Sequence, residues 1–199
     1  PKELFYAGNV PDWQNKILCV VGARKNSNYG REVTEFLIEG LRGFPITIVS
    51  GLAFGIDSIA HKSAMDAGLK TIAIPGSGLN KDVLYPRSHF RLAEEIIEHK
   101  GTLLSEFEPN FKATNWSFPQ RNRIMAGISN AVLVIEAEQK SGTLITSRLA
   151  TEYNRDVLTI PGNIFYPHSE GPNMLLRLGA TPIRNSEDIL EALHLENKL

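Results

Sequence analysis

Three glycine-rich segments are the parts of this sequence best suited to binding a charged ligand. Each follows a run of β-branched and aliphatic residues, and they are Gly22–Gly30, Ser50–Gly55 and Pro75–Gly78. Glycine lets a backbone approach a ligand closely, and the first amides of a following helix attract an anion. One such turn is equally well explained by the steric needs of a tight strand-to-helix connection. Three turns at one sheet edge favour a site for phosphate groups.

These turns do not match the standard nucleotide-binding motifs. The pair Gly76 and Gly78 continues to Lys81, where a dinucleotide fingerprint would have its third glycine. The G-x-x-x-x-G-K-[S/T] pattern of ATP-binding loops is also missing from the sequence. An enzyme of the usual NAD or ATP type is therefore disfavoured, and we expect no cofactor.

Basic side chains gather near the same expected sheet edge. A single lysine or arginine is usually solvated surface charge, but several that converge can bind phosphate. Two of the arginines stand two apart on one predicted helix, so they cannot share a face and at most one is expected to face the ligand. The basic residues are Arg24, Lys25, Arg121, Arg123 and Lys140, the last directly before Ser141, Gly142 and Thr143 at a helix start.

Residues suited to catalysis are less convincing. Asp57 and His61 have the i, i+4 spacing that could serve a metal or an acid–base pair. However, Asp57 lies in a first helical turn, where a carboxylate complements the helix dipole, and no further ligand lies nearby in the sequence. We expect neither a metal site nor a catalytic residue. Acidic residues near strand ends could form carboxylate pairs or orient basic neighbours: Glu106, Glu108, Glu136 and Glu138.

Aromatic side chains near a phosphate track would allow bases to stack, which is how proteins hold single strands without reading sequence. Each candidate could equally belong to the core. The candidates are Phe54, Phe111, Trp116 and Phe118.

The elements that must position these residues alternate between strands and helices, which predicts an α/β protein with a doubly wound, mostly parallel sheet and helices on both faces. The strands are apolar almost throughout, as burial on both faces requires. Predicted strands are 17–21, 46–50, 71–75, 102–106, 131–136 and 157–161. Predicted helices are 29–41, 55–68, 89–99, 121–129, 142–153 and 186–195.

Composition limits the classes of function. The 199 residues are 42% hydrophobic and 22% charged, which is typical of a globular domain. No apolar run is long enough for a membrane helix, and the lone Cys19 lies in an apolar run, so a cytoplasmic protein is expected. The net charge of −1 provides no bulk attraction to nucleic acid, so any such site must be a local cluster.

Six motifs, in order along the chain, are similar to those of a known family. They are VVGARKNSNYG at 20–30, SGLAFGIDSIAH at 50–61, GSGLNKDVLYP at 76–86, FPQRNRIMAGIS at 118–129, EAEQKSGTLIT at 136–146 and TIPGN at 159–163. On these motifs the sequence resembles the DNA-processing protein A (DprA/Smf) family over about residues 4 to 183.

The resemblance implies an extended Rossmann-like core that binds single-stranded DNA, forms a homodimer and hands the strand to the RecA recombinase in natural transformation. It implies no enzymatic reaction. We expect an N-terminal extension at 1–16, the core at 17–185 and a C-terminal helix at 186–199. Because the first residue is Pro1, the chain can be a fragment, and the helical and winged-helix domains that flank this core in family members are expected to be absent.

The family's phosphate-binding residues are carried over position by position. Its arginine after the first strand corresponds to Arg24, although Ala23 stands where the family usually has a hydroxyl side chain. Dimerisation in the family would involve the region around Met174 to Leu178. The other matching positions are Ser50, Gly51, Gly55, Arg121, Arg123, Lys140, Ser141, Gly142 and Thr143.

Two other functions stay open at this point. Related Rossmann-like phosphoribohydrolases use a P-G-G-x-G-T-x-x-E motif, but Thr146 stands where their glutamate would be. Threonine cannot supply the carboxylate that stabilises an oxocarbenium-like charge. The second is a sensor that binds a free nucleotide without turning it over, for which the same phosphate site would serve.

Overall fold

The computed structural model describes residues 1–139 and 141–195 and contains an eight-stranded sheet with the order β1-β5-β4-β3-β2-β6-β7-β8. Every neighbouring pair is parallel except β1 and β5. The strands are β1 (Phe5–Gly8), β2 (Lys16–Val21), β3 (Ile46–Ser50), β4 (Lys70–Ala73), β5 (Thr102–Ser105), β6 (Ala131–Val134), β7 (Asp156–Thr159) and β8 (Thr181–Pro182).

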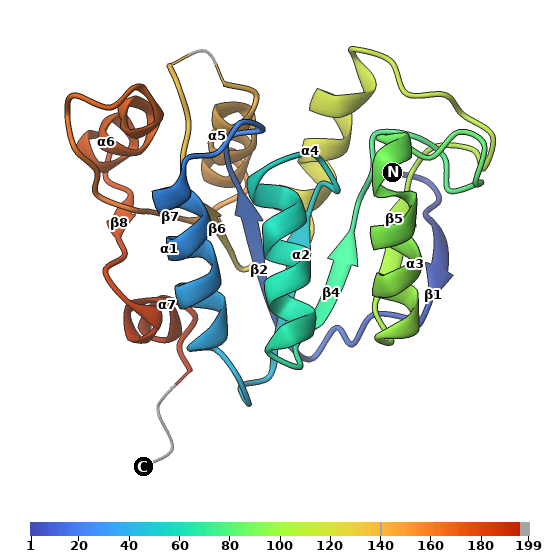
Figure 1. Cartoon of the computed structure of the whole chain (residues 1–199), viewed down its shortest axis with the longest axis horizontal. Helices are drawn as coiled ribbons and strands as arrows, with labels where there is room; N and C mark the ends of the chain where they lie inside the picture. Colours follow the sequence, from blue (N-terminus) through green and yellow to red (C-terminus); the bar gives the residue numbers. More distant parts are fainter. Residues whose placement is uncertain (140, 196–199) are drawn as a thin grey trace.

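Helices cover both faces of this sheet (Figure 1), as the apolar strands predict. One face carries α1 (Asn28–Glu39), α2 (Ile56–Asp66), α3 (Phe90–Glu98) and α7 (Ser186–Ala192). The other carries α4 (Ser117–Ile128), α5 (Thr143–Glu152) and α6 (Glu170–Arg177). Short 3₁₀ turns, η1 (Arg87–His89) and η2 (Pro167–Ser169), precede α3 and α6. None of the described helices is long and apolar enough to span a bilayer.

The central strand β2 shows why two layers of helices are needed. Its residues alternate between two hydrophobic cores: Leu18 and Val20 pack with α1 and α2, whereas Cys19 and Val21 pack with α4. All four side chains are buried, so neither face of the strand can be left to solvent. Burial also raises the pKa of the Cys19 thiol far above its ordinary value, so this cysteine is an apolar core residue.

The six predicted strands are confirmed, each with boundaries within two residues of those observed. Two strands and one helix were not predicted. The expected N-terminal extension contains β1, which pairs antiparallel with β5 at the sheet edge, while β8 has only two residues. Helix α6 was missed because Gly171 and Pro172 stand in its first turn, where proline is tolerated. Likewise, α4 begins at Ser117 rather than Arg121, with Pro119 in its first turn.

The order of the strands fixes where a ligand can reach the backbone. From β2 the chain moves outward through β3, β4 and β5, then crosses to β6 on the other side of β2 and continues to β7. The connections after β2 and β6 therefore diverge to opposite faces of the sheet. In open α/β sheets, the crevice at such a switch point, beyond the carboxyl ends of the strands, is where ligands bind.

His61 is part of the core rather than of a catalytic pair. Its Nδ1 lies 2.7 Å from the hydroxyl of Thr71, which donates its own proton to the carbonyl of Ile48. Nδ1 must therefore carry the ring proton, and the buried Nε2 has no partner among the described residues. Desolvation, with smaller contributions from His89 and Arg121, lowers the pKa of His61 to about 3.

This burial predicts a dependence of stability on pH. The unfolded chain takes up a proton at His61 below its ordinary pKa of 6.5, but the folded chain does so only near 3. The free energy of unfolding should therefore fall as the pH drops below 6.5, by up to about 1.4 kcal/mol per pH unit from this residue. When the free energy of unfolding, measured with urea, is plotted against pH between 6.5 and 4.5, the slope should be shallower for His61→Gln than for the wild type. Equal slopes would contradict the assignment.

The turn between β3 and α2 allows a matched test of packing. Gly55 has φ of +73°, and a Cβ there would lie 2.6 Å from the carbonyl oxygen of Arg24 and closer still to that of Ala23. Gly43 has φ of +83° but open space around it. Gly43→Ala should lower the free energy of unfolding by about 1 kcal/mol, through backbone strain alone, and Gly55→Ala should lower it by about 2–4 kcal/mol. Chemical denaturation measures both losses. Similar losses for the two variants would show that the chain segments 23–24 and 55 are not held together.

Candidate functional site

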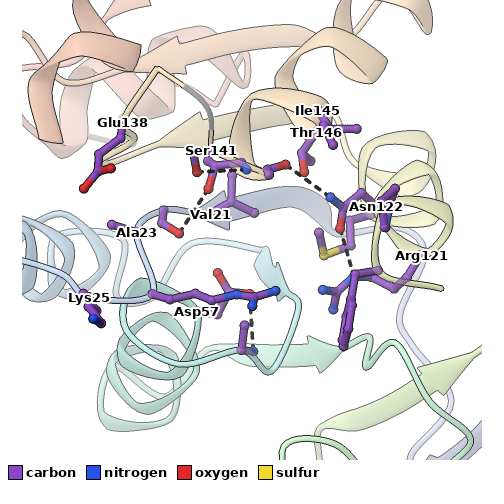
Figure 2. Close-up of a pocket in the computed structure, with 18 of the residues that line it drawn as sticks. Val21, Ala23, Lys25, Asp57, Arg121, Asn122, Glu138, Ser141, Ile145 and Thr146 are labelled. Atoms are coloured by element: carbon purple, nitrogen blue, oxygen red, sulfur yellow. Dashed lines mark hydrogen bonds between the residues drawn. The ribbon is translucent and has the colours of Figure 1, made fainter. Parts of the chain in front are cut away.

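A pocket of about 680 Å³ lies at the switch point, beyond the carboxyl end of β2. Figure 2 shows Ser141 and Thr146 along one side, with Asn122 and Arg121 of α4 beside them and Asp57 across from them. The lining comes from four segments and two further residues: 21–25 at the end of β2, Ala53 and Asp57 around the start of α2, residues of 115–125 around the start of α4, and 138, 141–143 and 145–146 before and in α5, with Tyr85 and His168.

The first glycine-rich turn holds one of the protein's own carboxylates. Glu136, which follows β6, accepts hydrogen bonds from the backbone amide of Ser27 at 3.0 Å and from the Ser27 hydroxyl. Ser27 is the N-cap of α1, and its hydroxyl also accepts from the amide of Gly30. A Cβ on Gly30 would collide with the Glu136 carboxylate, so glycine is needed there for this internal contact. The N-terminus of α1 is therefore already paired with an anion.

The amides of the second glycine-rich turn also donate to one of the protein's own carboxylates. The carboxylate of Asp57 accepts from the amides of Gly51 at 3.1 Å and Ala53 at 3.4 Å. Burial raises the pKa of Asp57, while the guanidinium of Arg121 and these two amides oppose that rise. Asp57 thus satisfies the turn that would otherwise present free amides to a ligand.

The third turn is covered by other parts of the chain. A Cβ on Gly76 would lie 2.5 Å from the ring of Phe118 in α4, and the amide of Gly78 donates to the carbonyl of Phe111 at 2.9 Å. The hydroxyl of Ser117 donates to the carbonyl of Gly76. The glycines of this turn therefore allow close packing against α4 and its preceding loop, and no residue of Pro75–Gly78 lines the pocket.

Helix α5 begins at the pocket, and no carboxylate of the described residues hydrogen-bonds to its first amides. Its N-cap, Gly142, offers no side chain, and the hydrogen bonds of the next amides, among the described residues, lie within their own turn. The amide of Thr143 donates to the hydroxyl of Ser141 at 3.2 Å, and that of Leu144 to the Ser141 carbonyl at 3.1 Å. Such local bonds are readily exchanged for a ligand oxygen, which the partial positive charge of the helix start also favours.

Two basic side chains at the pocket are free to meet an anion. Arg24 and Lys25 both line it, both are exposed, and neither makes an ion pair with any part of the chain that the structure describes. The guanidinium of Arg24 lies over the ring of Phe118, 5.5 Å from its centroid. Phe118 in turn lies beside Tyr85, with 5.5 Å between the ring centroids. One wall of the pocket is therefore aromatic, with a cation above it.

The two arginines of α4 point in different directions, in agreement with their spacing. Arg121 lines the pocket but is buried, and its guanidinium donates to the carbonyls of Gly51 and Ile74 and to the side chain of Asn122. It therefore ties α4 to the ends of β3 and β4 beside Asp57. Arg123 lies outside the pocket and pairs with Glu106.

The other predicted site residues are placed as follows. Ser141, Gly142 and Thr143 line the pocket, whereas Ser50, Gly51 and Gly55 lie behind its wall. The hydroxyl of Ser50 donates to the carbonyl of Val20, inside the sheet. Lys140 lies outside the described residues.

Some pocket residues were not predicted. Asn122 and Tyr85 lie within the quoted motifs, but nothing in their spacing distinguished them from neighbours that face the core. Of the aromatic candidates, Phe118 lines the pocket, whereas Phe111 and Trp116 pack with Phe107 in a separate cluster. Thr146, the residue in place of the hydrolase glutamate, also lines the pocket. The residues the structure describes contain no cluster of three metal-ligating side chains.

Comparison with protein families places the site in context. The family model for DNA recombination-mediator protein A matches residues 1–194. The protein Smf of Escherichia coli is 43% identical over 193 residues, which cover 97% of this chain and 51% of that protein. The DNA processing protein DprA of Streptococcus pneumoniae is 42% identical over 190 residues, covering 96% and 66%. The chain thus spans about half to two thirds of the length of these relatives.

Solved structures agree with this result. The X-ray structure of DprA from Streptococcus pneumoniae superposes with a TM-score of 0.88, at 42% identity, over 94% of this chain and 65% of that one. A structure of DNA processing protein A from Helicobacter pylori, described for its single-stranded DNA binding mode, gives 0.87 at 31% identity over 98% and 87%. A molybdenum cofactor binding protein from Rippkaea orientalis, at 0.61 and 15% identity, shares the fold alone. By sequence and by structure, the chain belongs to the DNA recombination-mediator protein A (DprA/Smf) family.

Proposed function

We propose that this domain binds single-stranded DNA in the pocket at the end of β2, with a phosphate at the start of α5 and a base against Phe118. The proposal rests on a helix N-terminus whose amides make only local bonds among the described residues, together with Arg24, a cation without an ion-pair partner among them that lies over an aromatic ring. The Helicobacter pylori relative, described as binding single-stranded DNA, has the same fold over 98% of this chain and supports the proposal.

On the phosphate side, the groups available are the amides of Gly142 and Thr143, the hydroxyl of Ser141 and the guanidinium of Arg24. Lys140, which directly precedes this turn, belongs to the same proposed set by its position in the sequence. These groups recognise phosphate oxygens and carry no information about base identity. Arg121 contributes by holding the pocket wall, through the hydrogen bonds of its Nε and Nη1.

On the base side, the wall of Phe118 and Tyr85 suits any base, since every base presents a π face. A duplex keeps its bases paired and stacked, so only an unpaired strand can offer a base to this wall. Weak sequence preference and a preference for single strands follow. Because phosphate contacts release counterions, affinity should fall steeply with added salt.

The wider role is a proposal from family membership. The domain would act in the cytoplasm as a mediator of recombination that delivers single strands to the RecA recombinase during transformation, without catalysing a reaction. Thr146 in the pocket supports the last point, because it provides no carboxylate for glycosidic cleavage. A free nucleotide would use the same phosphate and base contacts, so the experiment below includes one.

Replacing Arg24 tests the site directly. Arg24→Ala removes a charge-assisted contact and should weaken binding of oligo-dT by about 10- to 100-fold at low salt, measured by fluorescence anisotropy. The slope of log affinity against log salt should also become shallower, by about 0.7 for each phosphate that Arg24 neutralises in the wild type.

Arg42→Ala is the matched control, because Arg42 follows α1 at the opposite end of the helix and pairs with Glu39. It should bind as the wild type does. Wild-type protein should bind a duplex of the same length, or thymidine monophosphate, more weakly than oligo-dT. Equal weakening in both arginine variants, or tighter binding of the free nucleotide, would contradict the proposal.

An exposed apolar surface supports the proposed homodimer. It comprises exposed residues of the loop before η2, of α6 and of the residue that follows α6; Phe165 in the loop is 85% exposed, and Leu178 after the helix is 76% exposed. Large apolar side chains gathered in this way are unusual on a monomer and indicate a protein contact. A second copy of the same chain would cover this surface and bring two pockets into one particle. Its other large members are Ile164, Tyr166 and Met174.

Leu178→Glu places a charge in this surface and should convert a dimer into a monomer, as measured by sedimentation velocity at micromolar concentration. Val10→Glu, at an exposed apolar residue close to the N-terminus, should leave the dimer intact. A wild-type monomer, or a dimer that survives the Leu178 change, would mean that this surface does not join two copies.

A further inference from the structure

A second aromatic surface lies beside the pocket and is not explained by the contacts proposed above. Phe54 directly follows the lining residue Ala53, yet its side chain is 44% exposed. Its ring meets that of His89 edge-on, with 4.8 Å between the centroids. We call Phe54 and His89 together the aromatic ledge.

The backbone holds the ledge in place. The ring of His89 is held by a contact of 2.8 Å between its Nδ1 and the carbonyl of Leu52. The backbone amide of His89 donates to the carbonyl of Pro86. On the other side, Gly55 fits against the carbonyls of Ala23 and Arg24 too closely for any side chain, which anchors the backbone next to Phe54. Neither ring therefore depends on a flexible loop for its position.

The ledge adjoins the pocket along two stretches of chain. Ala53 and Tyr85 both line the pocket. Ala53 directly precedes Phe54, and Tyr85 stands four residues before His89. Between Tyr85 and His89 lies Arg87, which is exposed and makes no ion pair with the rest of the described chain. Aromatic rings interleaved with a free cation form the arrangement that holds successive nucleotides of a single strand.

The geometry points to a second base-binding subsite on the aromatic ledge, which takes the base next to the one held in the pocket. This inference rests on the proposed binding of single-stranded DNA and extends it: the minimal ligand is two adjacent bases rather than one nucleotide. The exposed face of Phe54 stacks on the second base, and Arg87 lies close to the phosphate that follows. A free mononucleotide can fill the pocket but cannot reach the ledge.

The test uses hexanucleotide backbones that are abasic except at one thymine or at two adjacent thymines. All these ligands carry the same phosphates, so the second base is the only difference between them. For the wild-type protein, the second thymine should tighten binding by about 5- to 100-fold, the range expected for one base stacked on an aromatic ring. Phe54→Ala should abolish this gain and bind the one-thymine ligand normally. Phe54→Trp should keep it.

Trp13→Ala is the matched control, since Trp13 is also an exposed aromatic residue but precedes the amino end of β2, away from the pocket. It should retain the full gain. If Phe54→Ala retains the gain as well, or weakens the one-thymine ligand equally, the second subsite is refuted while the pocket stands. If the wild type binds neither ligand nor oligo-dT, the proposed function fails, and the ledge with it.

Discussion

The amide groups of tight strand-to-helix turns must find hydrogen-bond partners, and in this domain the protein's own carboxylates supply them at two turns. Glu136 pairs with the start of α1, and Asp57 pairs with the turn before α2. An unpaired buried amide costs about 1–3 kcal/mol, so these carboxylates stabilise the sheet edge on which the site is built. They also exclude a phosphate from both places. Among the described residues no carboxylate bonds to the start of α5, which leaves this helix start for an external anion.

The two walls of the pocket offer different chemical groups. The α5 side offers amides and hydroxyls, whereas the opposite side offers the ring of Phe118 beneath the guanidinium of Arg24. Arg121 also lines the pocket, and its Nε and Nη1 donate to the protein itself, so it positions the wall beside Asp57. The proposed ligand, a polymer with alternating phosphates and flat bases, offers one kind of group to each of these two walls. The domain needs only this local charge, which is consistent with its net charge of −1.

Much of the fold could be predicted because buried strands are continuous apolar runs, and the family motifs identified the edge that carries the site. The partners of the glycine-rich turns could not be predicted, because Glu136 and Ser27 are separated by 109 residues and no local pattern links them. Helical spacing predicted that Arg121 and Arg123 lie on different faces of one helix. Only the packing of the fold showed which of them lies at the pocket. Edge strand β1 was missed because it has only four residues, ends in a glycine and is shorter than the runs from which the other strands were predicted.

Whether a strand binds at the start of α5 is tested most directly by NMR. The backbone amide resonances of ¹⁵N-labelled protein are recorded during titration with a short oligo-dT. We predict that the amide resonances of Gly142 and Thr143 shift and reach saturation, whereas those of Ser27 and Gly51 move little because their amides stay hydrogen-bonded to Glu136 and Asp57. Large shifts at Ser27 and Gly51, with Gly142 and Thr143 unchanged, would show that the strand displaces the internal carboxylates and does not bind at the start of α5.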